Sequence, residues 1–176
     1  GTLSLQFSVS DTLDPYEAKT LANQQICQLI FDGLVKLDEN LNPVYRIAEK
    51  ITVSDKTCTA ALKDVVFSDG TKVTAEDVVS SFSRAKEAKY SEYADQLKNI
   101  ESCSANGNEV VFKLTRADVG IAGVLDFPIV KKDSENLEND DGKILPPIGA
   151  GRYVYNDDSG TYTLTGNEKY YGSVPK

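Results

Sequence analysis

The sequence VVFSDGTKVTAEDVVSSFSRA, residues 65–85, contains the densest set of structural signals in this chain. An apolar run ends at Phe67, and a Ser-Asp-Gly turn follows, in which Gly70 is free to adopt a positive φ. Thr74 lies three residues before Asp77, the spacing at which a hydroxyl and a carboxylate each satisfy an unpaired N–H group at a helix start. This pattern predicts a corner where a strand leads into a helix with Thr74 as its N-cap.

The residues after this cap repeat at helical spacing. We expect the inward face of the helix to consist of Val78, Val79, Phe82 and Ala85. The acidic pair Glu76-Asp77 falls in the first helical turn, where carboxylates interact favourably with the helix dipole, so capping is preferred over catalysis. The corner therefore indicates a sheet covered by a helix.

Three further elements are predicted before the corner. Residues 2–8 alternate apolar and polar side chains, which is typical of a strand with one buried face. A helix is then indicated, which we expect Gly33 to end, and residues 34–43 predict a short strand closed by a polar turn. The expected apolar face of that helix consists of Ala22, Ile26, Leu29 and Ile30.

The rest of the chain also alternates strands and helices. Residues 50–70 predict short strands with a turn at Ser54-Asp55-Lys56, and Asn106-Gly107 predicts the turn of a hairpin over residues 100–114. Short helices within residues 89–100 and 118–126, a charged surface loop at residues 131–143 and a hairpin around Asp158-Ser159-Gly160 complete the expectation. Interleaved helices and strands place the fold in the mixed α/β (α+β) class.

Composition excludes several kinds of function. The chain has 176 residues, a net charge of −8 and no histidine. Nucleic acid and anionic membrane surfaces require clustered Lys and Arg, so neither is an expected partner. Without histidine there is no Ser-His-Asp or Cys-His catalytic arrangement and no His-ligated zinc. We expect a non-enzymatic domain without a cofactor or metal, and a glycosidase-like pair of carboxylates is the remaining enzymatic alternative.

The three cysteines are Cys27, Cys58 and Cys103, and their spacing is not that of a zinc motif. Cys27 lies in an apolar helical pattern, which predicts a buried thiol. Cys58 and Cys103 both lie in strand-like segments, a placement that allows a disulfide between them. An apolar run of about 18 residues, the length that spans a membrane, does not occur.

Tyr90 and Tyr93 are three residues apart and lie beside small polar residues. They either line a ligand groove or cover the core, and both interpretations stay open. The sequence GAGRY, residues 149–153, is rich in glycine but precedes a strand, so we expect a tight turn rather than a phosphate-binding loop.

Two parts of the sequence resemble the extracellular solute-binding proteins of family 5, the peptide- and nickel-binding receptors of ABC importers. The first part, residues 13–85, contains LDP, GLVKL, AEKITVS and FSDGTKVTAEDVVSSFSRA in the family's order. The second part, residues 146–172, reads PPIGAGRYVYNDDSGTYTLTGNEKYYG.

The resemblance implies part of one lobe of a two-lobed periplasmic-binding-protein-like fold, with a mixed sheet, covering helices and β-hairpins. Residues 1–176 would form a single domain, a fragment of the first lobe without the second. In peptide-binding relatives the stretch after Asp-Pro offers its backbone to the peptide as an added strand does. By position, that stretch corresponds to Lys19, Thr20 and Leu21, for which the entry to a helix is the alternative.

The resemblance also matches Tyr90 to a tyrosine that lines the cleft of such relatives. Together with Tyr93, these residues are the expected ligand-binding set. The implied function is the substrate-binding component of an ABC importer that captures extracellular oligopeptides, with the importer permease as a partner. The implied location is extracellular, cell-surface or periplasmic, with membrane association only through a lipid anchor outside this chain.

Two alternatives to peptide capture stay open. One is a sensing or interaction module with the same fold, which the presence of permease and ATPase genes beside the full-length gene would argue against. The other is a receptor for a nickel chelate or another small solute.

Overall fold

The turn predicted within residues 65–85 is present in the computed structural model, which describes residues 5–158 and 160–173. The Phe67 N–H donates to the Thr71 carbonyl oxygen at 2.8 Å, and Gly70 between them has a φ of +90°. Only glycine adopts this backbone conformation at little cost, so the Ser-Asp-Gly signal is confirmed.

Helix α2 (Ala75–Glu87) begins at this corner. The Asp77 N–H donates to the Thr74 hydroxyl at 3.4 Å, and Asp77 Oδ2 accepts from the Thr74 N–H at 2.8 Å. The predicted reciprocal cap is therefore confirmed. Asp77 does more than cap, because its Oδ1 also accepts from the N–H of Lys132 at 2.9 Å and so ties a distant loop to the helix start.

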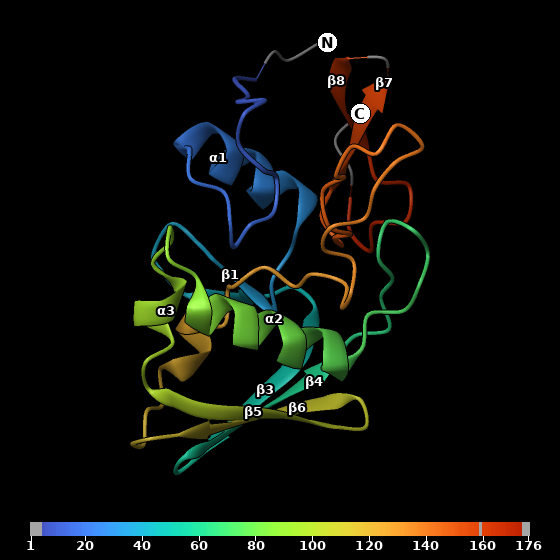
Figure 1. The fold of residues 1–176 in the computed structure, drawn as a ribbon. Helices are drawn as coiled ribbons and strands as arrows, with labels where there is room; N and C mark the ends of the chain where they lie inside the picture. Colours follow the sequence, from blue (N-terminus) through green and yellow to red (C-terminus); the bar gives the residue numbers. More distant parts are fainter. Residues whose placement is uncertain (1–4, 159, 174–176) are drawn as a thin grey trace.

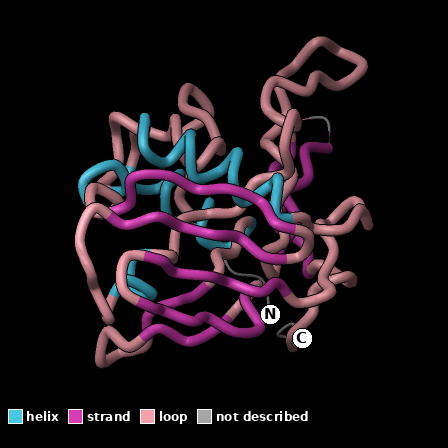
Figure 2. The backbone as a smooth tube through the Cα atoms, turned by 90° about the horizontal axis from the view of Figure 1, so that it is seen from below, coloured by secondary structure: helices cyan, strands magenta, loops and turns pink. Residues whose placement is uncertain are grey.

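Four antiparallel strands form the sheet that α2 covers (Figures 1 and 2). Their order across the sheet is β3 (Ala48–Ser54), β4 (Thr57–Leu62), β6 (Glu109–Leu114) and β5 (Ile100–Asn106). The ring of Phe82 on α2 meets the rings of Phe112 and Phe127 at centroid distances of 5.9 and 6.1 Å. Val78 and Ala85 are buried as predicted, whereas Val79 is only half-buried at the edge of this face.

The remaining elements are short. They are α1 (Leu21–Ile30), β1 (Val35–Leu37), β2 (Pro43–Tyr45), α3 (Tyr93–Gln96), the 3₁₀ helix η1 (Ile121–Val124), β7 (Tyr153–Asp158) and β8 (Thr161–Gly166). The pairs β1–β2 and β7–β8 are hairpins, and the β5–β6 turn contains Gly107 with a φ of +60°, as Asn106-Gly107 predicted. The turns at Gly70 and Gly107 therefore lie where the sequence predicted them.

The mixed α/β class is confirmed, but the expected mixed sheet is not seen. Every pair of strands within residues 5–158 and 160–173 is antiparallel. Tight turns join β3 to β4 and β5 to β6, and a tight turn permits only antiparallel pairing. The pair β4–β6, whose strands are not consecutive in the chain, is antiparallel as well.

The sequence GAGRY brings the chain onto the end of α1. The Gly151 N–H donates to the Ile30 carbonyl oxygen at 2.8 Å. A Cβ atom at Gly151 would lie 2.4 Å from that oxygen, and one at Gly149 would lie equally close, at 2.4 Å. The predicted tight turn is not formed, because Gly149 pairs with Val130 in an isolated bridge and residues 151–152 form only a bend before β7. The glycines are needed instead for a close approach between distant segments.

A polar cluster secures the segment YYG near the end of the described chain. Asp32 Oδ2 accepts from the Tyr171 hydroxyl at 2.6 Å and from Arg46 Nη2 at 3.1 Å, and the Tyr170 hydroxyl also bonds to Arg46. Burial and the Asp32 charge raise the pKa of Tyr171, so its hydroxyl remains a donor. This cluster connects the two parts of the sequence that resemble family 5.

The predicted strand at residues 2–8 is not formed where it can be seen. Residues 2–4 lie outside the described residues, and residues 5–8 have no strand pairing. Instead, Phe7 packs on Tyr155 and Tyr162 at centroid distances of 6.1 and 5.1 Å. The predicted buried face is not formed in the described residues either, since Leu5 is exposed and Phe7 is only half-buried, and ring packing replaces a hydrogen-bonded ladder.

The expected end of the first helix is also corrected. Helix α1 ends at Ile30, three residues before the predicted stop at Gly33, and Phe31 is its C-cap. Its buried face is Asn23, Ile26, Cys27 and Ile30, so Ala22 and Leu29 are only half-buried. Gly33 is needed for another reason, because a Cβ there would lie 2.8 Å from the Asp126 carbonyl oxygen.

All three cysteines are free, so the predicted Cys58–Cys103 disulfide is wrong. Their strand placements are right, but β6 separates β4 from β5, and both cysteines are in register with Phe112. Adjacent strands are about 4.8 Å apart, so two spacings place the cysteines roughly 10 Å apart. A disulfide requires Cα atoms within about 7 Å. Cys27 is buried, as predicted.

Candidate functional site

Asp11 organises the backbone of the predicted binding segment. Its carboxylate accepts from the N–H groups of Lys19 and Thr20 at 3.0 and 2.7 Å, and from the Thr20 hydroxyl at 2.7 Å. Burial alone would raise the pKa of Asp11, but hydrogen bonds from Thr20, Thr12 and Lys19 outweigh it, so this pKa is lowered. The carboxylate therefore remains ionised and holds the segment in place.

These contacts change what the predicted segment can offer a ligand. Thr20 is extended, with φ −84° and ψ 141°, and its hydroxyl caps α1 by accepting from the Asn23 N–H. The N–H groups of Lys19 and Thr20 are already used, so a free strand edge with both donors is not present. Within the described part of the chain, the Lys19 carbonyl oxygen accepts no hydrogen bond, and the Leu21 side chain is 69% exposed.

The structure brings Tyr90 to this segment. Lys19 Nζ lies 5.0 Å from the centroid of the Tyr90 ring, a cation–π contact. The Gln24 side-chain amide donates to the carbonyl oxygens of Ala18 and Tyr90 at 2.9 and 3.0 Å, which joins the two segments. Tyr90 is 47% exposed, so its ring is accessible beside Lys19.

Tyr93 lies differently from Tyr90. Its ring packs edge-on against the buried ring of Tyr16 at a centroid distance of 5.8 Å, and burial raises its pKa to about 12. Of the two interpretations left open for this pair, core cover describes Tyr93, whereas Tyr90 is exposed and lines none of the three hollows that surround residues 19–21.

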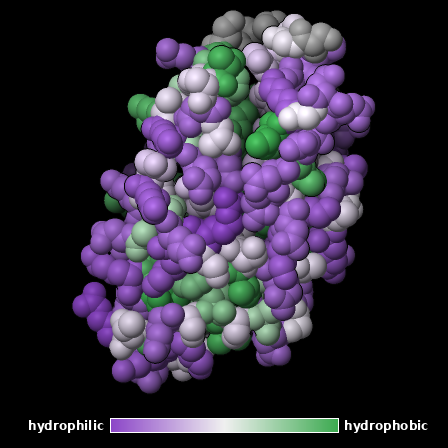
Figure 3. All heavy atoms as spheres, in the orientation of Figure 1, coloured by the Kyte–Doolittle hydropathy of each residue, from purple (hydrophilic) through white to green (hydrophobic). Residues whose placement is uncertain are grey.

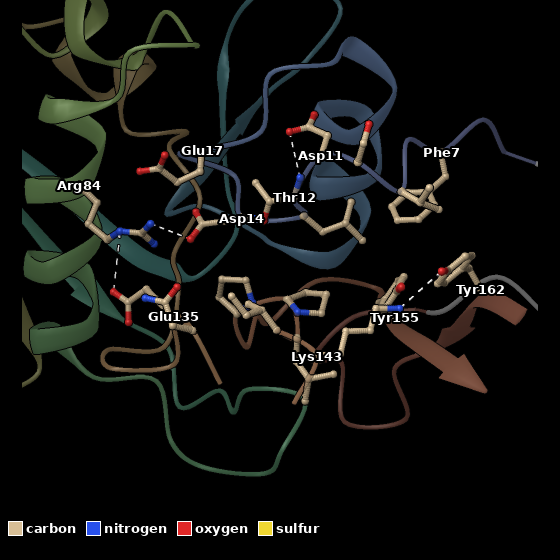
Figure 4. A pocket seen from close by; sticks show the side chains of 18 residues that line it. Phe7, Asp11, Thr12, Asp14, Glu17, Arg84, Glu135, Lys143, Tyr155 and Tyr162 are labelled. Carbon is tan, nitrogen blue, oxygen red and sulfur yellow. Dashed lines mark hydrogen bonds and ion pairs between the residues drawn. The ribbon is translucent and has the colours of Figure 1, made fainter. Parts of the chain in front are cut away.

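Three open hollows surround the segment. Lys19 and Thr20 line one of about 420 Å³, and Leu21 lines a smaller, mostly apolar one of about 180 Å³. The largest, of about 690 Å³, is defined here as the main pocket and shares Ser10–Thr12 and Glu17 with the first (Figure 4). Hydrophilic residues predominate on the face seen in Figure 3, with apolar residues in separate patches.

One end of the main pocket is charged. Arg84 Nη2 donates to Asp14 at 2.7 Å, and Arg84 Nε lies 3.8 Å from Glu135 (Figure 4). The guanidinium carbon also lies 5.2 Å from the centroid of the Tyr16 ring. Asp14 belongs to the LDP sequence and Arg84 to the sequence after the corner. The pair therefore joins two of the segments on which the resemblance rests, a contact that residue spacing does not predict.

The other end of the main pocket is aromatic. Phe7, Tyr155 and Tyr162 meet there, and Lys143 lies beside Tyr162 (Figure 4). The sequence analysis missed these residues. Tyr155 and Tyr162 lie on opposite strands of the β7–β8 hairpin, so the only signal was an aromatic residue on each side of a predicted turn.

No group of three or more acidic, Cys or His side chains is placed to hold a metal ion among the residues that the structure describes. A search of the same residues finds no helix long and apolar enough to cross a membrane.

This chain belongs to the bacterial extracellular solute-binding proteins of family 5, whose middle region matches residues 42–176. The resemblance noted in the sequence is thereby confirmed. The glutathione-binding protein GsiB of Escherichia coli (strain K12) is 29% identical over 149 residues, which are 81% of this chain and 29% of that protein. The family and the relatives found are binding proteins.

Solved structures of other proteins share this fold. The oligopeptide-binding protein AppA from Bacillus subtilis, in complex with a nonapeptide, has a TM-score of 0.71 at 25% identity, covering 90% of this chain and 34% of its own. NikZ from Campylobacter jejuni, in complex with Ni(L-His), has a TM-score of 0.72 at 23% identity, covering 97% and 36%. This chain thus spans about a third of the length of the relatives it matches.

Proposed function

We propose that this chain is part of one lobe of an extracellular receptor that captures oligopeptides for an ABC importer, and that residues 1–176 form a single domain of that lobe. The observation on which this rests is the arrangement around Leu21. Lys19, whose carbonyl oxygen accepts no hydrogen bond from the described residues, lines one hollow and places its Nζ 5.0 Å from the centroid of the accessible Tyr90 ring, and the exposed Leu21 side chain lines a second hollow. A peptide could use all three, with an N–H donated to the carbonyl and side chains against Leu21 and Tyr90.

The relatives support a peptide-like solute. GsiB is named for glutathione, and AppA was solved with a nonapeptide, whereas NikZ was solved with a nickel–histidine complex. We infer peptides because an unused backbone acceptor next to apolar and aromatic surface suits a main chain with side chains. The permease partnership, the extracellular or periplasmic location, a lipid anchor outside this chain and the lack of catalysis are parts of the same proposal.

Amide resonances of the ¹⁵N-labelled chain test the proposal during titration with tetra-alanine. We expect shifts centred on Lys19, Leu21 and Tyr90, and little change at Tyr93. Leu21→Ala and Tyr90→Ala should weaken binding. Val119→Ala is the matched control for Leu21→Ala, because Val119 is likewise an exposed apolar residue but, unlike Leu21, lines none of the three hollows.

Two results would contradict the peptide proposal. One is a set of shifts that avoids residues 19–21 and Tyr90. The other is a set of amide shifts with the nickel complex of L-histidine and none with peptides, which would favour the nickel-chelate alternative.

A further inference from the structure

Three aromatic rings form a cluster at the hairpin end of the main pocket. Phe7 lies 5.1 Å from Tyr162 and 6.1 Å from Tyr155, measured between ring centroids. Tyr155 and Tyr162 are stacked at 6.1 Å with an interplanar angle of 23°. All three line the pocket, and Tyr162 is the most exposed of them, at 38%.

A positive charge already lies at this cluster. Lys143 Nζ is 4.7 Å from the centroid of the Tyr162 ring and 3.5 Å from its hydroxyl, and it is hydrogen-bonded to Asp157. An ammonium group over a ring face with a carboxylate beside it is the arrangement by which proteins bind ammonium ligands. The contact shows that the geometry of the cluster suits such a group.

The pocket as a whole favours positive charge. Its lining contains four carboxylates, those of Asp11, Asp14, Glu17 and Glu135, against the two cations Arg84 and Lys143. Arg84 is engaged by Asp14 and Glu135. Glu17 is exposed at the rim and forms no ion pair within the described ranges. With Lys143 counted as part of the lining, the pocket still carries an excess of negative charge.

We propose that the cluster of Phe7, Tyr155, Tyr162 and Asp157 is a binding site for the ammonium group of a small solute, and that Lys143 occupies it when no solute is bound. This site is separate from the peptide surface at Lys19 to Leu21. The proposal depends on the aromatic end of the main pocket and on Asp157, which does not line the pocket but is hydrogen-bonded to Lys143, and not on the peptide proposal.

Lys143 is suited to be displaced. Its side chain is 45% exposed and lies at the end of the polar loop of residues 131–143, so it can turn into water. An incoming ammonium group would take its place over Tyr162 and beside Asp157. The exchange replaces one positive charge by another, so Asp157 is not left unpaired.

Choline and 3,3-dimethylbutan-1-ol provide a test, because they share a shape and differ in charge. The Tyr ring resonances of the full chain report binding. We expect choline to shift Tyr155 and Tyr162 and the neutral alcohol to bind about ten-fold more weakly. Equal binding of the two probes, or no shift with choline, would overturn the proposal.

Variants test the roles of the Tyr162 ring and of Lys143 separately from general effects on folding. Lys143→Ala should bind choline about five-fold more tightly because the competing internal cation is gone. Lys113→Ala is the matched control, since Lys113 bonds to Thr57 on the sheet and does not line the pocket. Tyr162→Phe should retain binding, and Tyr162→Leu should lose it. Loss of choline binding in Lys143→Ala with unchanged melting would contradict displacement.

These measurements do not touch the peptide site. If choline does not shift the resonances of Tyr155 and Tyr162, the amide shifts of residues 19–21 still decide the peptide proposal. If peptides do not shift residues 19–21, the choline measurements still decide the ammonium site.

Discussion

Gly151 and Gly123 form a matched pair at the residue scale. A Cβ at Gly151 would lie 2.4 Å from the Ile30 carbonyl group, whereas one at Gly123 would meet no atom within 4 Å. Backbone cannot move aside as a flexible side chain can, so we expect Gly151→Ala to lower the free energy of unfolding by about 3 kcal/mol. Gly123→Ala should change it by no more than about 0.5 kcal/mol.

Urea denaturation of the two variants gives the comparison. The midpoint should fall for Gly151→Ala while the slope stays unchanged. An equal effect of the two substitutions would mean that the end of α1 and residues 149–151 are not in contact.

Burial also sets the reactivity of the thiols. It raises the pKa of Cys58 to about 11 and that of Cys103 to about 12, and it raises the pKa of Cys27 as well. Only the thiolate reacts, and a raised pKa reduces the thiolate present at a given pH. We expect iodoacetamide to modify the native chain slowly at pH 8 and faster as the pH rises toward 11.

Unfolding removes this protection. In denaturant without reductant, three thiols should react per chain, because all three cysteines are free. A count of one would restore the Cys58–Cys103 disulfide.

At the scale of elements, the start of α2 depends on a single hydroxyl. Thr74→Ala removes the acceptor for the Asp77 N–H, and we expect the free energy of unfolding to fall by about 1 kcal/mol. Thr74→Ser keeps the hydroxyl and should recover most of the loss. Chemical denaturation measures the stability of both variants. An unchanged denaturation midpoint for Thr74→Ala would show that the cap does not stabilise this helix.

The elements that sequence analysis predicted are those whose interactions are local. The cap joins Thr74 to Asp77, and the β5–β6 turn depends on Gly107, so the deciding residues are neighbours in the chain. The end of α1 was missed because Gly33 has its role in contact with Asp126, which lies far along the sequence. A glycine near a helix end has two explanations, and only tertiary packing distinguishes them.

At the scale of the whole molecule, the open hollows limit affinity. A hydrogen bond exposed to water contributes about 0.5–1.5 kcal/mol net. Ordering a peptide and losing its translational freedom costs about 4–15 kcal/mol. The small number of groups at Leu21 and Tyr90 cannot offset that cost. We therefore expect this 176-residue chain to bind short peptides no more tightly than about 1 mM.

Isothermal titration with a pool of short peptides measures this affinity, with the full-length protein as the comparison. Micromolar binding by the 176-residue chain would show that the described residues supply a nearly complete site.

The candidate site was predictable only in part. Lys19, Thr20, Leu21 and Tyr90 follow from resemblance, and the structure places them together. Their hydrogen bonding was not predictable, because Asp11 reaches the Lys19 and Thr20 N–H groups through a loop that composition does not reveal. The aromatic cluster was missed for the same reason, since Phe7 and Tyr155 are brought together only by the fold.

The bond between the Gly151 N–H and the Ile30 carbonyl oxygen has a consequence for the order of folding. Its two partners are roughly 120 residues apart, and contacts of such separation form late because a long loop must close first. The sheet of β3 to β6 lies wholly within that loop, so it can assemble while α1 is still without its final neighbour. During synthesis, the Ile30 carbonyl oxygen would therefore lack this partner until the ribosome has released residues 149–151, so the end of α1 would be completed last.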